Sequence, residues 1–208
     1  MIKWIFSLVL IFILISIIYP LSFIASIDVS FIRFFEEIRT EFLTDLFLLI
    51  SDIGSIKVIL PITFFVVFVL VIRRDFIGAI YLLVLFFGVR AFNYELKGLF
   101  SRDRPDFEAV YEAAYYSFPS GHSMNSAASY SFICFILLVN FMFKSSVNAT
   151  LVSFTSILIL LIGLSRVYLG VHFITDVAAG FLAGIAWCLV VVLLYRQTKT
   201  KFDKKSNV

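Results

Sequence analysis

The sequence predicts an all-α integral membrane protein, a bundle of six transmembrane helices with an interfacial helix and a loop on its outward side. Of the 208 residues, 62% are hydrophobic and 15% are charged. Soluble domains have about 45–50% apolar and about 25% charged residues. Six apolar stretches are each long enough to cross a bilayer, and most charges lie between them. We expect the whole chain, residues 1–208, to form one membrane domain.

A membrane-spanning helix needs about 20 mostly apolar residues. The first apolar stretch is longer than the core of a signal peptide, and no cleavage site of small residues follows it, so we expect it to be retained. The predicted spans are Trp4–Ala25, Ser55–Ile72, Phe76–Leu96, Ser120–Phe143, Ala149–Leu169 and His172–Tyr195.

The segment of residues 26–54 between the first two spans is richer in charge. Its apolar residues, among them Phe31, Phe35 and Phe42, recur at helical spacing. This pattern is typical of an amphipathic helix that lies on the membrane surface. We expect Arg33 and Arg39 within it to extend toward lipid headgroups.

The distribution of lysine and arginine indicates the orientation. If the N-terminus is cytoplasmic, the inner segments hold nine basic and two acidic residues, and the rest of the chain holds eight basic and twelve acidic residues. Cytoplasmic loops carry an excess of Lys and Arg. We therefore predict cytoplasmic termini in a cell membrane, with the basic tail 196–208 solvated near lipid headgroups and not binding nucleic acid.

Five ionisable residues lie at or near span ends. The sequence has two histidines; His122 opens the fourth predicted span, and His172 opens the sixth. Lys97 ends the third span, Arg104 follows it, and Arg166 lies near the end of the fifth. Spans three and five end on the side where spans four and six begin, so all five groups share one membrane face. Ionisable residues at membrane depth indicate function.

The cations in this cluster favour an oxyanion over a metal ion as ligand. Arginine matches phosphate oxygens in bidentate fashion, and lysine adds a point charge. Ser120 stands at an N-cap position, and Gly121 permits close backbone approach at a helix N-terminus, which is itself an anion site. We therefore predict a phosphate pocket and no bound metal or cofactor.

Asp176 follows His172 by four residues, so the two side chains share one helical face. The carboxylate can accept a hydrogen bond from one imidazole nitrogen and leave the other free as a nucleophile. His122, on a neighbouring helix, is placed to protonate a leaving oxygen as a general acid.

Three segments resemble the motifs of the type 2 phosphatidic acid phosphatase superfamily. The segment from Lys97 to Pro105 is similar to KxxxxxxRP, Pro119–His122 resembles PSGH, and Ser165–Asp176 is similar to SRxxxxxHxxxD. The resemblance covers residues 97–176 and departs from no motif position.

The resemblance implies a metal-independent lipid phosphatase that forms a covalent phosphohistidine. In this chain the nucleophile would be His172, oriented by Asp176, with His122 as the acid. The phosphate would be held by Lys97, Arg104 and Arg166, with backbone support from Ser120 and Gly121. The substrate would be a membrane lipid, either phosphatidylglycerophosphate or undecaprenyl pyrophosphate. The alternative is a non-catalytic protein that binds or transports lipid phosphates, and the sequence leaves the oligomeric state open.

The remaining polar residues have structural interpretations. We expect Arg102 to be a solvated loop charge. For Arg90, Asn93 and Lys97 we favour an internal polar network, with Glu95 as a further member, over contact with substrate. Gly180 and Gly184 are spaced as a helix-packing face. Tyr111, Tyr115 and Tyr116 either form an aromatic belt or shape the mouth of the pocket. Cys134 and Cys188 are expected to be free, small apolar residues within helices.

Overall fold

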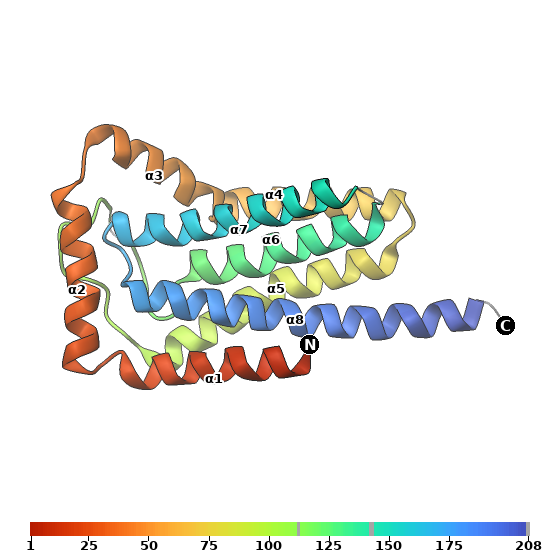
Figure 1. The fold of residues 1–208 in the computed structure, drawn as a ribbon, viewed down its shortest axis with the longest axis horizontal. Helices are drawn as coiled ribbons and strands as arrows, with labels where there is room; N and C mark the ends of the chain where they lie inside the picture. Colours follow the sequence, from red (N-terminus) through yellow and green to blue (C-terminus); the bar gives the residue numbers. More distant parts are fainter. Residues whose placement is uncertain (112, 142–143, 207–208) are drawn as a thin grey trace.

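The computed structural model describes residues 1–111, 113–141 and 144–206, and in this part of the chain the secondary structure is helical. The helices are α1 (Ile2–Ile18), α2 (Ser22–Glu37), α3 (Glu41–Ile53), α4 (Ile56–Ile72), α5 (Phe76–Phe100), α6 (Gly121–Asn140), α7 (Ser145–Tyr168) and α8 (Ile174–Ser206) (Figure 1).

The structure supports between four and six of the predicted spans, and the first of them, Trp4–Ala25, is not one continuous helix. Helices α5, α6, α7 and α8 are long and apolar enough to cross a membrane, and the bent pairs α1–α2 and α3–α4 raise the number to six. Large apolar side chains such as Phe6, Phe65 and Leu160 are exposed on the outer faces of these helices, as lipid contact requires. The predicted end of the fourth span at Phe143 and the last two residues of the basic tail lie outside the described residues.

The segment of residues 26–54 is not one surface helix. Helix α1 ends at Ile18, and α2 begins at Ser22 with a bend of 95°. Pro20 lacks an N–H group, so the ladder of helical hydrogen bonds cannot continue through it. A second break precedes α3, where Thr40 caps the helix by accepting from the Leu43 N–H at 3.3 Å. Helix α2 consequently lies across one end of the bundle (Figure 1).

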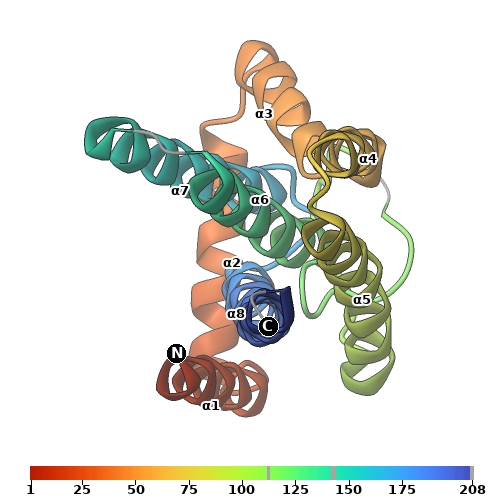
Figure 2. The same cartoon turned by 90° about the vertical axis from the view of Figure 1, so that its right-hand side faces the viewer.

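Helix α6 occupies the middle of the bundle. It packs most extensively on α8 and also on α5 and α7, and α1 lies against α8 (Figure 2). The expected glycine face holds α6 and α8 together: a Cβ atom on Gly180 would lie 2.7 Å from the Ser120 carbonyl oxygen, and one on Gly184 would lie 2.4 Å from that of Met124. This close packing brings the first turn of α8 beside the first turn of α6.

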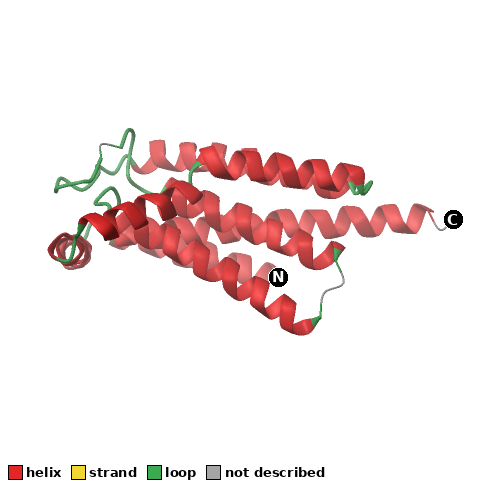
Figure 3. Cartoon of the chain, turned by 90° about the horizontal axis from the view of Figure 1, so that it is seen from above, coloured by secondary structure: helices red, strands yellow, loops and turns green. Residues whose placement is uncertain are grey.

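The ends of the helices confirm the parity argument. Helices α5 and α7 end, and α6 and α8 begin, at the end of the bundle that α2 crosses, while both termini extend toward the opposite end (Figure 1). The long loop between α5 and α6 is gathered at the same end as α2 (Figure 3). Cys134 and Cys188 are buried and free, as expected.

Candidate active site

The predicted functional residues converge at this end of the bundle. Lys97 is in the last turn of α5, and Arg166 is in the last turn of α7. His122 is the second residue of α6, and Asp176 is in the first turn of α8. His172 lies in the short connection between α7 and α8, where the side chain is 2% exposed.

A tight turn fixes the position of His172. The backbone N–H groups of Val171 and His172 both donate to the carbonyl of Arg166, at 3.2 and 3.3 Å. Gly170 adopts a φ of 72°, a conformation that residues with a side chain rarely adopt. The Phe173 N–H donates to Asp176 Oδ2 at 2.9 Å and so caps the start of α8. The imidazole and the carboxylate are therefore placed by one short segment.

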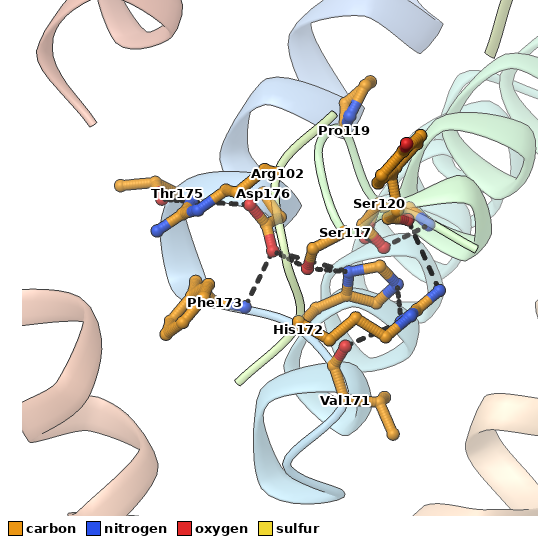
Figure 4. Close-up of polar contacts among 12 residues, drawn as sticks. Arg102, Ser117, Pro119, Ser120, Val171, His172, Phe173, Thr175 and Asp176 are labelled. Atoms are coloured by element: carbon orange, nitrogen blue, oxygen red, sulfur yellow. Dashed lines mark hydrogen bonds and ion pairs between the residues drawn. The ribbon is translucent and has the colours of Figure 1, made fainter. Parts of the chain in front are cut away.

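The hydrogen bond between His172 and Asp176 is indirect. His172 Nδ1 lies 3.1 Å from Ser117 Oγ and 3.5 Å from Asp176 Oδ2. The Ser117 hydroxyl donates to Asp176 Oδ2 at 2.5 Å, so it accepts from the imidazole (Figure 4). This direction leaves the proton on Nδ1 and the lone pair on Nε2. Ser117 lies outside the three motifs and was not among the predicted site residues.

The free nitrogen of His172 faces cationic groups. Nε2 lies 3.3 Å from Arg104 Nη1. Burial, and then the charges of Arg104, Arg166 and Lys97, hold the pKa of His172 well below its usual value. The imidazole is therefore neutral at physiological pH, and a neutral nitrogen can act as a nucleophile.

The three predicted phosphate-binding cations are held by neutral groups. Arg104 donates to the carbonyls of Val171 at 2.7 Å and Tyr115 at 2.8 Å. Lys97 Nζ donates to carbonyls of the loop, including that of Ser117 at 3.2 Å, and Arg166 donates to the hydroxyls of Ser51 and Tyr111.

None of these cations has a carboxylate partner within 4.0 Å in the part of the chain that the structure describes. The buried Nε of Arg166 also lacks a hydrogen-bond acceptor there. Lys97 and Arg166 are buried and Arg104 is half-buried, and such a cluster of cations without carboxylate partners is suited to bind an anion.

The PSGH segment forms the N-terminus of α6 beside these cations. The Ser120 side chain caps the helix by accepting from the Ser123 N–H at 3.5 Å, and the Ser120 N–H donates to the Asp176 carbonyl at 3.0 Å. At Gly121 a Cβ atom would lie 3.0 Å from Asn93 Oδ1. His122 is half-buried and lies within electrostatic range of His172 and of the three cations.

The prediction that Arg102 is a solvated loop charge is wrong. Its guanidinium donates to Asp176 Oδ1 at 2.6 Å and to Asp28 Oδ2 at 2.8 Å, and the side chain is 10% exposed. The guanidinium also lies between two rings, 4.4 Å from the centroid of Tyr19 and 4.1 Å from that of Phe173. The partners come from α2 and α8, far from Arg102 in the sequence, so local pattern could not reveal them.

The prediction for Arg39 is also wrong, because its guanidinium turns into the protein. It donates to the carbonyl of Glu108 at 2.6 Å and to that of Tyr168, at the end of α7, at 2.8 Å. A cation placed on the last carbonyls of a helix is favourable. Arg33 is exposed, and its contact with headgroups stays a prediction.

The expected polar network on α5 is not one network. The Asn93 side chain donates to the Pro119 carbonyl at 3.3 Å, and Lys97 turns to the loop carbonyls. The Arg90 guanidinium lies 5.8 Å from the centroid of the Phe86 ring, and Glu95 is exposed. Asn93 and Lys97 therefore both donate hydrogen bonds to the loop segment that leads into α6, and Arg90 makes no such contact.

Two of the loop tyrosines lie in different surroundings. The Tyr111 hydroxyl accepts from Arg166, and Tyr111 lines a cavity of about 510 Å³ with Arg104 and Val171; neither histidine lines this cavity, so a place at the pocket mouth stays a prediction. Tyr115 instead stacks on Tyr94, with ring centroids 5.2 Å apart, at the bundle surface. A larger cavity of about 920 Å³ lies at the opposite end of the bundle, beside Arg73 and Lys199, away from the histidines.

Comparisons with known proteins identify the family of the chain. The sequence model of the PAP2 superfamily matches residues 76–200. The chain is 32% identical over 179 residues to phosphatidylglycerophosphatase B of Bacillus subtilis (strain 168), which covers 86% of this chain and 88% of that protein.

Two solved structures are similar to the chain. The crystal structure of a transmembrane PAP2-type phosphatidylglycerolphosphate phosphatase from Bacillus subtilis matches with a TM-score of 0.86 and 30% identity, covering 97% of this chain and 96% of that one. LpxE of Aquifex aeolicus matches with a TM-score of 0.62 and 24% identity, covering 79% and 93%. The second likeness concerns the fold alone.

Proposed function

The chain belongs to the PAP2 superfamily and is a membrane lipid phosphatase, and from this premise we propose that it removes the terminal phosphate of phosphatidylglycerophosphate through His172. The observation that carries the proposal is the state of the imidazole. Nδ1 is held by Ser117, and Nε2 faces Arg104 at 3.3 Å inside a cluster of unpaired cations. A neutral nucleophile is thus aimed at the place where a phosphate would bind.

The reaction proceeds in two displacements. In the first, the lone pair of His172 Nε2 forms a bond to phosphorus, and the bond from phosphorus to the ester oxygen breaks. His122 gives its proton to that oxygen, which leaves as the alcohol of phosphatidylglycerol. In the second, water attacks the phosphohistidine while His122 takes up a proton. The bond between phosphorus and Nε2 then breaks, and inorganic phosphate leaves.

The surrounding groups stabilise the phosphoryl charge. Lys97, Arg104 and Arg166 supply three positive charges from three segments of the chain. The Gly121 N–H lies at the N-terminus of α6, where the helix dipole favours an anion, whereas the Ser120 N–H already donates to the Asp176 carbonyl. These groups are fixed before substrate arrives, so they need little reorganisation as charge develops on the phosphoryl oxygens.

The site faces outward in this proposal. The excess of basic residues at the end that carries both termini supports a cytoplasmic location for that end. In this orientation the opposite end, which holds the histidines, would lie at the level where a lipid headgroup meets water. A lipid substrate would keep its acyl chains in the bilayer while its terminal phosphate reaches His172.

The two candidate substrates differ in their leaving groups. Phosphatidylglycerophosphate releases an alcohol, and undecaprenyl pyrophosphate releases a lipid monophosphate. We favour the first because the relative with 32% identity is named for that activity. The intact His122, His172 and Asp176 argue against a non-catalytic lipid-binding protein.

The test is phosphate release by purified protein in detergent, from both lipids and from phosphatidic acid, in the presence of EDTA. We expect the highest kcat/KM for phosphatidylglycerophosphate and no turnover by His172→Gln. A higher kcat/KM for undecaprenyl pyrophosphate would reassign the substrate but keep the mechanism. Turnover that persists in His172→Gln, or that EDTA abolishes, would exclude the mechanism.

A further inference from the structure

Ser117 occupies a central position among the residues that the mechanism uses. It is buried, with 0% of its surface exposed, in the loop before α6. Each of its polar groups has a partner. Its N–H donates to the Arg102 carbonyl at 2.8 Å, and its carbonyl accepts from Lys97 Nζ at 3.2 Å. Its hydroxyl stands between the imidazole of His172 and the carboxylate of Asp176 (Figure 4).

The direction of these hydrogen bonds is determined by the final acceptor in the series, the carboxylate of Asp176. The carboxylate of Asp176 accepts from Arg102 at Oδ1 and from the Phe173 N–H at Oδ2, so it acts as a charged acceptor. The Ser117 hydroxyl has one hydrogen and gives it to Oδ2. Its lone pairs then face His172 Nδ1 at 3.1 Å, and only a protonated Nδ1 satisfies them.

We propose that Ser117 is a positioning residue for His172, which fixes the proton on Nδ1 and transmits the charge of Asp176 to the ring. When Nε2 forms its bond to phosphorus, positive charge develops on the imidazole. The Nδ1–H then donates more strongly to the hydroxyl, which is polarised by the carboxylate beyond it. No proton is transferred in this step, so the hydroxyl acts through hydrogen bonds alone.

Asp176 alone does not provide this contact. The 3.5 Å between Nδ1 and Oδ2 is long for a hydrogen bond, and Oδ2 already accepts two others, from Ser117 and Phe173. Removal of the Ser117 hydroxyl would leave Nδ1–H buried without a close acceptor. The tautomer with the proton on Nε2, which cannot attack phosphorus, would then become more populated.

The chain is well suited to a direct test because it has two histidines. Protein labelled with 15N-histidine in lipid nanodiscs gives the ring signals of His122 and His172, and His122→Gln assigns them. A fixed tautomer shows one protonated and one unprotonated nitrogen with well-separated shifts, and exchange between tautomers brings the two shifts together. We expect a fixed tautomer with a protonated Nδ1 for His172 in the wild type, and partly averaged shifts in Ser117→Ala.

The kinetic test compares three variants. Ser117→Ala should lower kcat by about 10- to 100-fold, the range that loss of a hydrogen-bond partner costs at a metal-ligating histidine, with KM within about twofold. Ser117→Thr keeps a hydroxyl and should restore most of both kcat and the fixed tautomer. Ser126→Ala is the matched control, because Ser126 is equally buried but its hydroxyl donates to the Ser123 carbonyl within α6.

Two results would overturn the inference. One is a wild-type His172 ring that is protonated on Nε2. The other is a His172 tautomer that stays fixed in Ser117→Ala, whether or not kcat falls. If Ser117→Ala does not fold, the wild-type spectrum and Ser117→Thr still decide the matter. The inference rests on the proposed function for its kinetic part only, since the spectrum is recorded without substrate. Turnover by His172→Gln would refute the nucleophile and leave the spectrum unaffected.

Discussion

Arg102 Nη1 donates to Asp176 Oδ1 across 2.6 Å, and its second terminal nitrogen donates to Asp28 Oδ2 across 2.8 Å. One guanidinium thus joins the carboxylate that serves His172 to a carboxylate of α2. Both carboxylates are fully buried. Asp28 also accepts from the N–H and hydroxyl of Thr175, at 3.1 and 2.7 Å, in the first turn of α8. The helix that crosses the end of the bundle is therefore anchored at the site.

Loss of Arg102 should be costly. Arg102→Gln would leave two buried carboxylates without their cation, and removal of one partner from a buried pair costs about 3–5 kcal/mol. We expect a clear drop in the thermal unfolding temperature in detergent, together with reduced turnover because Asp176 loses its fixed position.

Asp28→Asn is the informative comparison, because it leaves Arg102 and Asp176 as a balanced pair. It should be milder than Arg102→Gln, and the double variant should be more stable than Arg102→Gln alone. Equal unfolding temperatures for wild type and Arg102→Gln would show that the bridge contributes no stability.

His122 should matter most for substrates with poor leaving groups. His122→Gln removes the proton donor, and such donors contribute about 10²- to 10⁴-fold. We expect turnover of a lipid phosphate to fall by this amount. The first displacement from p-nitrophenyl phosphate should fall far less, because nitrophenolate leaves without a proton. The measurement is the rate of phosphoenzyme formation with each substrate after rapid mixing. An equal loss for both substrates would argue against the acid role.

The depressed pKa of His172 predicts how stability depends on pH. In the unfolded chain the imidazole takes up a proton near its usual pKa of about 6.5, whereas in the folded protein it stays neutral. Below that pH the unfolded state binds more protons, so the free energy of unfolding falls as pH falls, by at most about 1.4 kcal/mol per pH unit for this group. Above it the contribution of His172 is constant.

The check is the unfolding temperature between pH 8 and pH 5 for wild type and His172→Gln. We expect the wild type to lose more stability on acidification than the variant, because the variant has no imidazole at this position to titrate. A variant with the same pH dependence as the wild type would mean that the pKa of His172 is the same in the folded and unfolded states.

Much of the site was predictable from the sequence because it depends on span order. Parity alone places Lys97, His122, Arg166 and His172 at one end of the bundle, and the structure brings them together there. The i, i+4 spacing of His172 and Asp176 also predicted their proximity, although not the hydroxyl between them. Local sequence patterns could not identify the roles of Ser117, Asp28 and Arg102, because these roles depend on contacts between segments distant in the sequence. Hydrophobic spacing predicted a single surface helix over 26–54, and it could show neither the break before α3 nor the 95° bend between α1 and α2.

The close packing of α6 on α8 yields the last prediction. Gly184→Ala would place a Cβ atom 2.4 Å from the Met124 carbonyl oxygen and 3.0 Å from the Ala127 Cβ atom, so the two helices must separate. Overpacking of this kind costs about 1–3 kcal/mol. Because Ser120 and His122 are on α6 and His172 immediately precedes α8, a shift of a few tenths of an ångström also displaces the general acid from the nucleophile. We expect a lower unfolding temperature and a larger fall in kcat than in KM.

Gly98→Ala is the matched control, since its added Cβ atom would meet only the Tyr115 hydroxyl at an ordinary 3.5 Å. Gly98 also lies in a helix, so the two substitutions share any gain in helix propensity, about 1 kcal/mol. The difference between the two variants therefore isolates the helix contact. If Gly184→Ala retained full turnover at an unchanged unfolding temperature, the spacing of α6 and α8 would not control the geometry of the site.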